Sequence, residues 1–164
     1  MNFNEAFTVL IGHEGRYTDD PKDRGNWTSG KIGIGICKGT KYGISAMTYP
    51  KVDIKNLTLE NAKEIYKRDF WDTIKLDQLP EYTHLDLFDM SVNCGSFVTI
   101  KTLQKTIGTK PDGIIGPDTI SKVFKCENFR LKFNSNRLLY YISLHNFDKY
   151  GKGWVRRVAI NLTL

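Results

Sequence analysis

The sequence of 164 residues lacks several features that would assign it directly to a class of protein. It has only three cysteines, at wide spacing: Cys37, Cys94 and Cys126. Three cysteines cannot form a complete disulfide framework, and neither they nor the three scattered histidines show the spacing of metal ligands. No run of about 18 apolar residues is present, so we expect no stable insertion into a membrane. The first residues lack the basic stretch and apolar core of a secretory signal, which predicts a protein made in the cytoplasm without a signal peptide.

The positive charge of the chain is unevenly distributed. The formal net charge is +6, yet residues 1–127 contain 17 Lys+Arg and 17 Asp+Glu. From residue 128 onward a single acid, Asp148, accompanies seven basic residues: Arg130, Lys132, Arg137, Lys149, Lys152, Arg156 and Arg157. This excess favours an anionic partner such as nucleic acid, anionic lipid or a cell-wall polymer, although a solvated basic helix face would explain it equally well. Because no recognised nucleic-acid-binding motif occurs, we expect no nucleic-acid partner.

The apolar pattern at the N-terminus predicts a helix. Its apolar residues recur at i, i+4, i+7 and i+8: Phe3, Phe7, Leu10 and Ile11. Asn2 and Glu5 have the spacing of a capping box, and Gly15 is suited to end the helix. Glu14 stands at i+11 and therefore falls within the same apolar arc, where its carboxyl would be partly buried.

The rest of the chain divides into a turn-rich segment and a helical segment. Residues 17–45 are rich in Gly, Asp and Thr, and "KIGIGI" at 31–36 predicts a twisted strand or hairpin. Beyond Pro50 we expect a helix capped by Thr58, then helices over about 80–94 and 98–107, one that begins at Pro117, and two over about 127–145 and 151–161. A helix, a small sheet and a helical bundle together predict an α+β protein that is mostly helical.

The chemistry carried by Glu14 depends on its position at the end of an apolar helix face. Burial raises the pKa of a carboxyl group, which would let Glu14 donate a proton to a leaving glycosidic oxygen. Asp19, Asp20 and Asp23 follow on the next loop, where a carboxylate could activate water, with a threonine hydroxyl to orient it. A salt-bridged surface glutamate and an ordinary Asp-rich turn explain the same residues and are commoner.

Six motifs in a fixed order provide further information: "GHEGRYTDDPKDRGNW", "GTKYGIS", "TLENAKEIYKRDFWD", "LFDMSVNCG", "LQKTIGTKPDGIIGPDT" and "KYGKGWVRR". Together they resemble glycoside hydrolase family 108, the phage-type N-acetylmuramidases, over about Phe3 to Val158. The resemblance implies a lysozyme-like fold in which an N-terminal helix and a small antiparallel sheet pack on a helical bundle. It also implies a catalytic region over residues 1–94 and a helical peptidoglycan-binding region over residues 95–164.

The resemblance also assigns roles to the acids of the first motif. The glutamate of the family falls on Glu14, which would be the general acid, with Arg16 in place of a glycine of the family's motif. The two aspartates of the family fall on Asp20 and Asp23. Related phage lysozymes place their aspartate nine residues after the glutamate, which favours Asp23 as the residue that positions water. Asp20 is then expected to brace the loop before Pro21 and to lie close to the substrate.

The threonine of the family falls most naturally on Thr40, ahead of "KYGI". This chain inserts about a dozen residues before that point, so Thr28 and Ser29 remain alternatives for the hydroxyl that orients water. Tyr42 could stack on a sugar face. Asp89 and Asn93 are four residues apart on one predicted helix, where they could contact sugar groups in a cleft or form a structural pair near the end of the helix.

The function implied by the resemblance is cleavage of the β-1,4 bond between N-acetylmuramic acid and N-acetylglucosamine in peptidoglycan. It implies no metal and no organic cofactor, and we expect a monomer whose partner is the cell wall. Such an enzyme would be a phage or prophage endolysin that reaches the wall through a holin-type lesion or a dedicated secretion route. A non-catalytic wall-binding or secretion-helper protein of the same fold is the alternative, and a basic nucleic-acid-binding domain is a more distant one.

Overall fold

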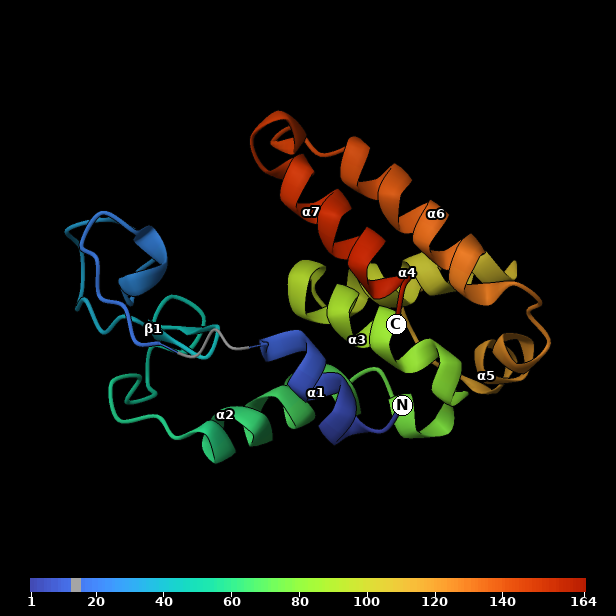
Figure 1. Cartoon of the computed structure of the whole chain (residues 1–164), viewed down its shortest axis with the longest axis horizontal. Coiled ribbons are helices and arrows are strands. Elements are labelled where there is room, and N and C mark those ends of the chain that lie inside the picture. Colours follow the sequence, from blue (N-terminus) through green and yellow to red (C-terminus); the bar gives the residue numbers. More distant parts are fainter. Residues whose placement is uncertain (13–15) are drawn as a thin grey trace. The chain divides into compact units, whose positions relative to one another are not determined.

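The computed structural model describes residues 1–12 and 16–164, and in these ranges the chain is mostly helical (Figure 1). The helices are α1 (Phe3–Ile11), α2 (Leu59–Tyr66), α3 (Glu81–Cys94), α4 (Ser96–Ile107), α5 (Pro117–Phe124), α6 (Phe129–Ile142) and α7 (Phe147–Asn161). A two-stranded antiparallel sheet consists of β1 (Thr40–Lys41) and β2 (Ile44–Ser45). The predicted class, α+β and mostly helical, is confirmed.

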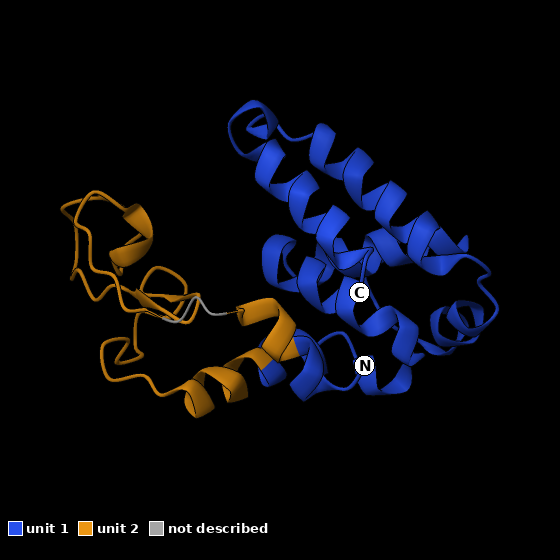
Figure 2. Ribbon diagram, viewed as in Figure 1, with its two compact units in different colours: residues 1–6, 67–164 blue, residues 7–66 orange. Residues whose placement is uncertain are grey.

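The chain forms two compact units (Figure 2). Unit 1 combines Met1–Ala6 with Lys67–Leu164, and unit 2 is the continuous segment Phe7–Tyr66. Helix α1 therefore contributes its first residues to unit 1 and the remainder to unit 2. The predicted boundary between residues 94 and 95 falls between α3 and α4, inside unit 1, and as a division of function it stays a prediction.

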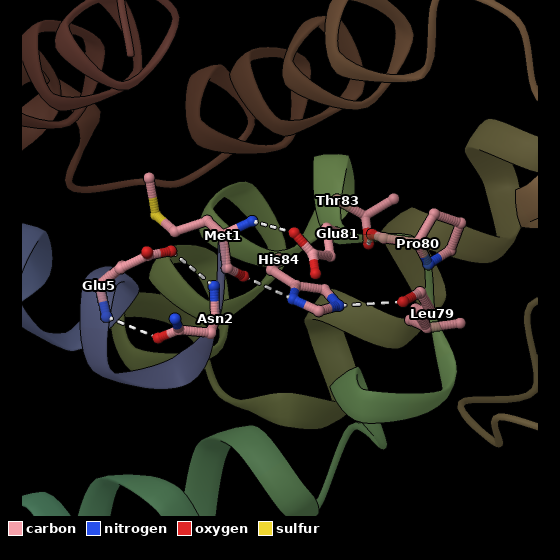
Figure 3. A network of polar contacts seen from close by, with 8 residues as sticks. All are labelled: Met1, Asn2, Glu5, Leu79, Pro80, Glu81, Thr83 and His84. Atoms are coloured by element: carbon pink, nitrogen blue, oxygen red, sulfur yellow. Dashed lines mark hydrogen bonds and ion pairs between the residues drawn. The ribbon is translucent and has the colours of Figure 1, made fainter.

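The start of α1 has the capping box that its sequence predicts (Figure 3). The amide of Asn2 donates to Glu5 Oε2 at 2.9 Å, and the amide of Glu5 donates to Asn2 Oδ1 at 3.1 Å. The helix ends at Ile11 and is followed by Gly12 in the left-handed region, with φ +56°. Gly15, the predicted terminator, lies outside the described residues.

Within unit 1, Met1 is bound to the start of α3 (Figure 3). Its ammonium group donates to Glu81 Oε2 at 3.0 Å, and its carbonyl oxygen lies 2.8 Å from His84 Nδ1. The other ring nitrogen of His84 lies 3.0 Å from the carbonyl oxygen of Leu79. Residues from opposite ends of the first half of the sequence are therefore joined in one polar network.

The core of unit 1 begins in the π-helical segment Lys67–Asp72, which continues α2. Trp71 is almost fully buried and packs edge-on against Phe3 and Phe88, at ring distances of 5.3 and 5.4 Å. Its indole nitrogen donates to Asp77 Oδ1, so its polar atom is satisfied although the ring is buried. Two predicted helix boundaries are also confirmed: Gly95 follows the last residue of α3, and Pro117 is the first residue of α5.

Unit 2 contains the sheet, but not where "KIGIGI" predicted it. Residues 31–36 form turns and bends, while β1 pairs with β2 so that Thr40 lies opposite Ser45. The strand predicted over 31–36 is therefore wrong, whereas the alternative, a hairpin, agrees with the antiparallel bridge between Trp27 and Cys37 on either side of this segment. Gly33 and Gly35 adopt left-handed φ values of +77° and +82°, which interrupt the extended backbone that a strand requires.

Tyr66 contacts the turn between β1 and β2, within unit 2. Its hydroxyl donates to the carbonyl oxygen of Tyr42 at 3.0 Å, and its ring packs edge-on against Phe7 at 5.5 Å. A Cβ at Gly43 would lie only 2.4 Å from the Tyr66 hydroxyl, so this close contact requires glycine. The last residue of α2 thereby sets the position of Tyr42 relative to α1.

Candidate active site

Asp23 lies on the acid loop, defined here as residues 19–26, and its side chain is exposed. Its Oδ1 accepts a hydrogen bond from the amide of Gly25 at 2.8 Å and so caps the short 3₁₀ helix Arg24–Asn26. Among residues 1–12 and 16–164, Oδ2 has no hydrogen-bond partner. One carboxylate oxygen therefore holds the loop, and the other is available to a water molecule.

Asp20 makes its contacts within the acid loop. Its Oδ1 accepts from the amide of Lys22 at 2.9 Å, and its carbonyl oxygen accepts from Asn26 Nδ2 at 3.1 Å. This geometry is that of an Asx turn, in which a carboxylate replaces a backbone acceptor. The contacts agree with the bracing role expected of Asp20, whereas its contact with substrate stays a prediction.

Asn26 joins the acid loop to β1. It is fully buried, its side-chain Oδ1 accepts from Thr40 Oγ1 at 2.7 Å, and its backbone amide donates to the carbonyl oxygen of Asp23 at 3.1 Å. Asp23 and Thr40 therefore both bond to the same buried residue. Sequence reasoning missed Asn26, although it stands within the motif "GHEGRYTDDPKDRGNW". Only its position in that motif could have marked Asn26 as part of the site. A side-chain amide that bridges two segments leaves no periodic pattern of residues in the sequence.

The two alternatives to Thr40 are occupied elsewhere. Thr28 Oγ1 accepts from the amide of Ile36 at 3.0 Å, and Ser29 Oγ donates to the carbonyl oxygen of Ile34 at 2.6 Å. Both hydroxyls thus hold the 28–36 loop together. Of the three candidates, Thr40 is the one whose side chain bonds to a residue of the acid loop.

A pocket of about 300 Å³ lies within unit 2 beside the end of α1. Apolar and polar residues from α1, the turn after β1 and the start of α2 line it: Phe7, Thr8, Ile11, Gly12, Tyr42, Leu59, Glu60 and Lys63. Tyr42 is half-buried and its ring lies 5.4 Å from Lys41 Nζ. Tyr42 is among these lining residues, and its predicted stacking on a sugar face stays a prediction. Glu14, which comes two positions after Gly12 in the sequence, lies outside the described residues.

Asp89 is in unit 1, on α3, and its carboxylate is buried in an ionic network. Arg137 donates to its Oδ2 and Arg157 to its Oδ1, each at 2.5 Å. Burial alone would lower the pKa of Arg137, but the charge of Asp89 and the Tyr141 hydroxyl together raise that pKa above its ordinary value. These contacts use both carboxylate oxygens of Asp89, which agrees with the structural interpretation of its motif.

Asn93 is exposed one turn after Asp89, and its side-chain amide donates to the Asp89 carbonyl oxygen at 2.6 Å. The roles of Asp89 and Asn93 in binding sugar therefore stay predictions. Across the described part of the chain, no group of three or more His, Cys, Asp or Glu side chains could hold a metal ion.

Comparison with known proteins identifies the family. Residues 7–95, more than half of the chain, match the family Glycosyl hydrolase 108, and this range contains the acid loop, Asn26 and Thr40. The chain belongs to glycosyl hydrolase family 108. A solved structure titled "Structure of Brucella abortus SagA" is similar at 30% sequence identity and a TM-score of 0.79. The similarity covers 96% of this chain and 89% of that chain. No curated protein matches significantly.

Membership of family 108 gives the class of the enzyme and the part of the chain that carries it. The enzyme is a glycoside hydrolase with a lysozyme-like fold, and the family acts on peptidoglycan. In this family 108 enzyme, the matched range begins on α1 and ends just after α3, so it includes all of unit 2 and part of unit 1. The helices from α4 onward lie outside the matched range.

Proposed function

We propose that this family 108 enzyme cleaves the β-1,4 bond between N-acetylmuramic acid and N-acetylglucosamine. The observation that carries the proposal is the pair of hydrogen bonds that Asn26 makes, one to the backbone of Asp23 and one to the hydroxyl of Thr40. It joins Asp23, whose Oδ2 has no partner among the described residues, to a hydroxyl whose proton is already donated. Together these two groups can accept both protons of a single water molecule.

The reaction assigned to these residues balances as a hydrolysis. Glu14 donates its proton to the glycosidic oxygen as the bond to the sugar anomeric carbon breaks. Asp23 Oδ2 takes a proton from water, whose oxygen forms the new bond to that carbon, while Thr40 Oγ1 orients the water by accepting its second proton. A water that attacks from the face opposite the leaving group inverts the anomeric configuration, which NMR of freshly released product detects.

The proposal extends to how the enzyme binds the cell wall and how it reaches it. Four exposed basic residues after residue 128, within the predicted binding region over residues 95–164, would hold peptidoglycan, whose lactyl and peptide carboxylates are anionic: Lys132, Lys149, Lys152 and Arg156. We further propose a monomeric phage or prophage endolysin that is made in the cytoplasm and reaches the wall through a holin-type lesion or dedicated release.

Mass spectrometry of digested wall tests the bond that is cut. A muramidase leaves N-acetylmuramic acid at each new reducing end and adds one water per cleavage. A new N-acetylglucosamine reducing end would contradict the proposed bond, and an anhydro sugar would contradict hydrolysis. Unchanged turbidity of a wall suspension that still binds the protein would support the non-catalytic alternative.

The Glu14→Gln variant tests the general acid. We expect it to retain wall binding and the thermal midpoint of the parent while wall lysis falls by at least about a hundredfold, because an amide cannot donate the required proton. The matched control is Glu64→Gln, since Glu64 is exposed on α2. Lysis by the Glu14→Gln variant above a few per cent of the parent rate, or an equal loss in the control, would overturn the assignment.

A further inference from the structure

Three isoleucine side chains project from unit 2 into solvent. Ile32, Ile34 and Ile36 belong to the isoleucine loop, defined here as residues 28–36, and are 58%, 56% and 63% exposed. Met47, which is 41% exposed, lies against the same loop, because a Cβ on Gly30 would come within 2.9 Å of its sulfur. Single exposed apolar residues are ordinary, but a group of four marks a contact surface.

The isoleucine loop holds these side chains outward through its own hydrogen bonds. Thr28 and Ile36 pair through two bonds of 3.0 Å, from the Thr28 amide to the Ile36 carbonyl and from the Ile36 amide to Thr28 Oγ1. Ser29 Oγ donates to the Ile34 carbonyl oxygen at 2.6 Å. Because these backbone groups are satisfied inside the loop, exposure of the isoleucines is a property of a formed loop.

The segment of sequence that carries this surface contains charge of only one sign. Residues 24–52 contain no Asp or Glu, and five basic residues stand among them: Arg24, Lys31, Lys38, Lys41 and Lys51. At its base, the isoleucine loop is bound to the acid loop, where Cys37 Sγ donates to the carbonyl oxygen of Asp19. An exposed apolar loop in a segment that carries only basic charged residues is suited to a partner that offers both apolar volume and negative charge.

An anionic lipid bilayer meets both requirements. Apolar side chains enter the boundary between headgroups and acyl chains, and each Lys or Arg near the surface gains attraction from anionic lipids. A polysaccharide offers little apolar volume to four aliphatic side chains. A second copy would bring two loops of the same positive sign together, which is unfavourable.

We propose that the isoleucine loop is a reversible contact site for the surface of an anionic lipid bilayer. This contact is peripheral, and no helix in the described ranges is long and apolar enough to cross a membrane. It is a second binding property of the molecule, independent of glycan cleavage, and would concentrate the enzyme at the membrane that borders the wall.

Co-sedimentation of the full chain with vesicles tests this contact. We expect binding to vesicles of phosphatidylcholine with phosphatidylglycerol, and little binding to phosphatidylcholine alone, with a decrease as salt is added. The triple variant Ile32→Ser, Ile34→Ser, Ile36→Ser should lose at least about tenfold in partition coefficient. Lys31→Gln should weaken binding to anionic vesicles by a smaller factor, because one of five cations is lost.

The matched control is a triple serine variant on α6 in unit 1, at Leu131, Leu139 and Ile142. These residues are 67%, 65% and 59% exposed, close to the exposure of the isoleucines. The control should keep full binding. Equal binding by the loop variant and the parent, loss in the α6 variant instead, or equal binding to neutral vesicles would each overturn the proposal.

Folding and self-association are checked on the same proteins. The loop variant should keep the circular dichroism spectrum, thermal midpoint and wall lysis of the parent, because the replaced side chains are exposed and outside the candidate active site. A parent that is dimeric without lipid and a loop variant that is monomeric would identify the surface as an interface between copies, which contradicts the proposal.

Discussion

At the scale of single residues, the hydrogen bonds of Asn26 connect Thr40, and neither Thr28 nor Ser29, to the acid loop. Thr40 is 14 positions from Asn26 in the sequence, yet its Oγ1 is bonded to the buried amide oxygen. Thr28 is only two positions from Asn26, but its hydroxyl is used within the isoleucine loop. Closeness along the chain would have favoured Thr28, whereas the hydrogen bonds favour Thr40.

Substitution of the two threonines separates a catalytic from a structural hydroxyl. We expect Thr40→Val to lower kcat by about a hundredfold, because the water loses its orienting acceptor. Thr28→Val should leave kcat near the parent value, and each substitution should lower the free energy of unfolding by about 1 kcal/mol through a lost hydrogen bond. Wall-lysis kinetics and urea unfolding measure the two effects. Thr40→Ser is the rescue control, and a Thr28→Val enzyme with the larger kinetic defect would reverse the assignment.

At the scale of elements, Gln104 shows how α4 holds the loop that leads to α5. Its Nε2 donates to Asp112 Oδ1 at 2.7 Å and to the Ile114 carbonyl oxygen at 3.0 Å, and its Oε1 accepts from the amide of Gly113 at 2.9 Å. The side chain is almost fully buried. One glutamine thus satisfies three loop groups, and its hydrogen bond holds the pKa of Asp112 below the ordinary value.

The hydrogen bond from Gln104 to Asp112 predicts that the stability of the fold falls as the pH falls. Because the folded-state pKa of Asp112 is lowered, its contribution to stability is present above its unfolded-state pKa and is lost as the pH falls through the folded-state pKa. Gln104→Met should return the pKa of Asp112 towards its ordinary value and remove that part of the acid dependence. Carboxyl-carbon NMR titration gives the pKa, and thermal midpoints across the acid range give the stability. Asp118→Asn on α5 is the control, and an unchanged Asp112 titration in the Gln104→Met variant would contradict the prediction.

At the scale of the whole molecule, charge has different roles in the two units. In unit 1, Asp89 on α3 binds Arg137 on α6 and Arg157 on α7, so one carboxylate connects three helices. In unit 2, five cations and three exposed isoleucines belong to one segment, residues 24–52, that contains no Asp or Glu. The net charge of +6 therefore combines buried cations that organise helices with exposed cations that are available to a partner.

Removal of the buried negative charge should affect unit 1 severely. Asp89→Asn leaves Arg137, which is fully buried, without its counter-charge, and we expect unfolding free energy to fall by about 3–5 kcal/mol. Asp72→Asn breaks the exposed ion pair with Lys67 and should cost about 0–1 kcal/mol. Chemical denaturation of both variants measures the difference. Similar costs for the two substitutions would show that the Asp89 network contributes no more than a surface pair.

Local signals predicted much of this fold, and long-range contacts account for what they missed. The Asn2–Glu5 capping box, the end of α3 at Gly95 and the start of α5 at Pro117 depend on residues a few positions apart, and all are confirmed. The alternating isoleucines predicted a strand incorrectly, because the backbone of that loop is set by Thr28, Ser29 and left-handed glycines. Asn26 was missed for the same reason, since its bonds join segments distant in sequence.

The two-segment composition of unit 1 has a consequence for synthesis on the ribosome. Residues 7–66 form one continuous stretch, so all of unit 2 leaves the exit tunnel before most of unit 1 has been made. Met1–Ala6 are translated before unit 2, yet their partners Trp71, Glu81 and His84 are translated after it. Met1–Ala6 must therefore wait for a segment beyond unit 2, and unit 1 can be completed only after unit 2 has been translated.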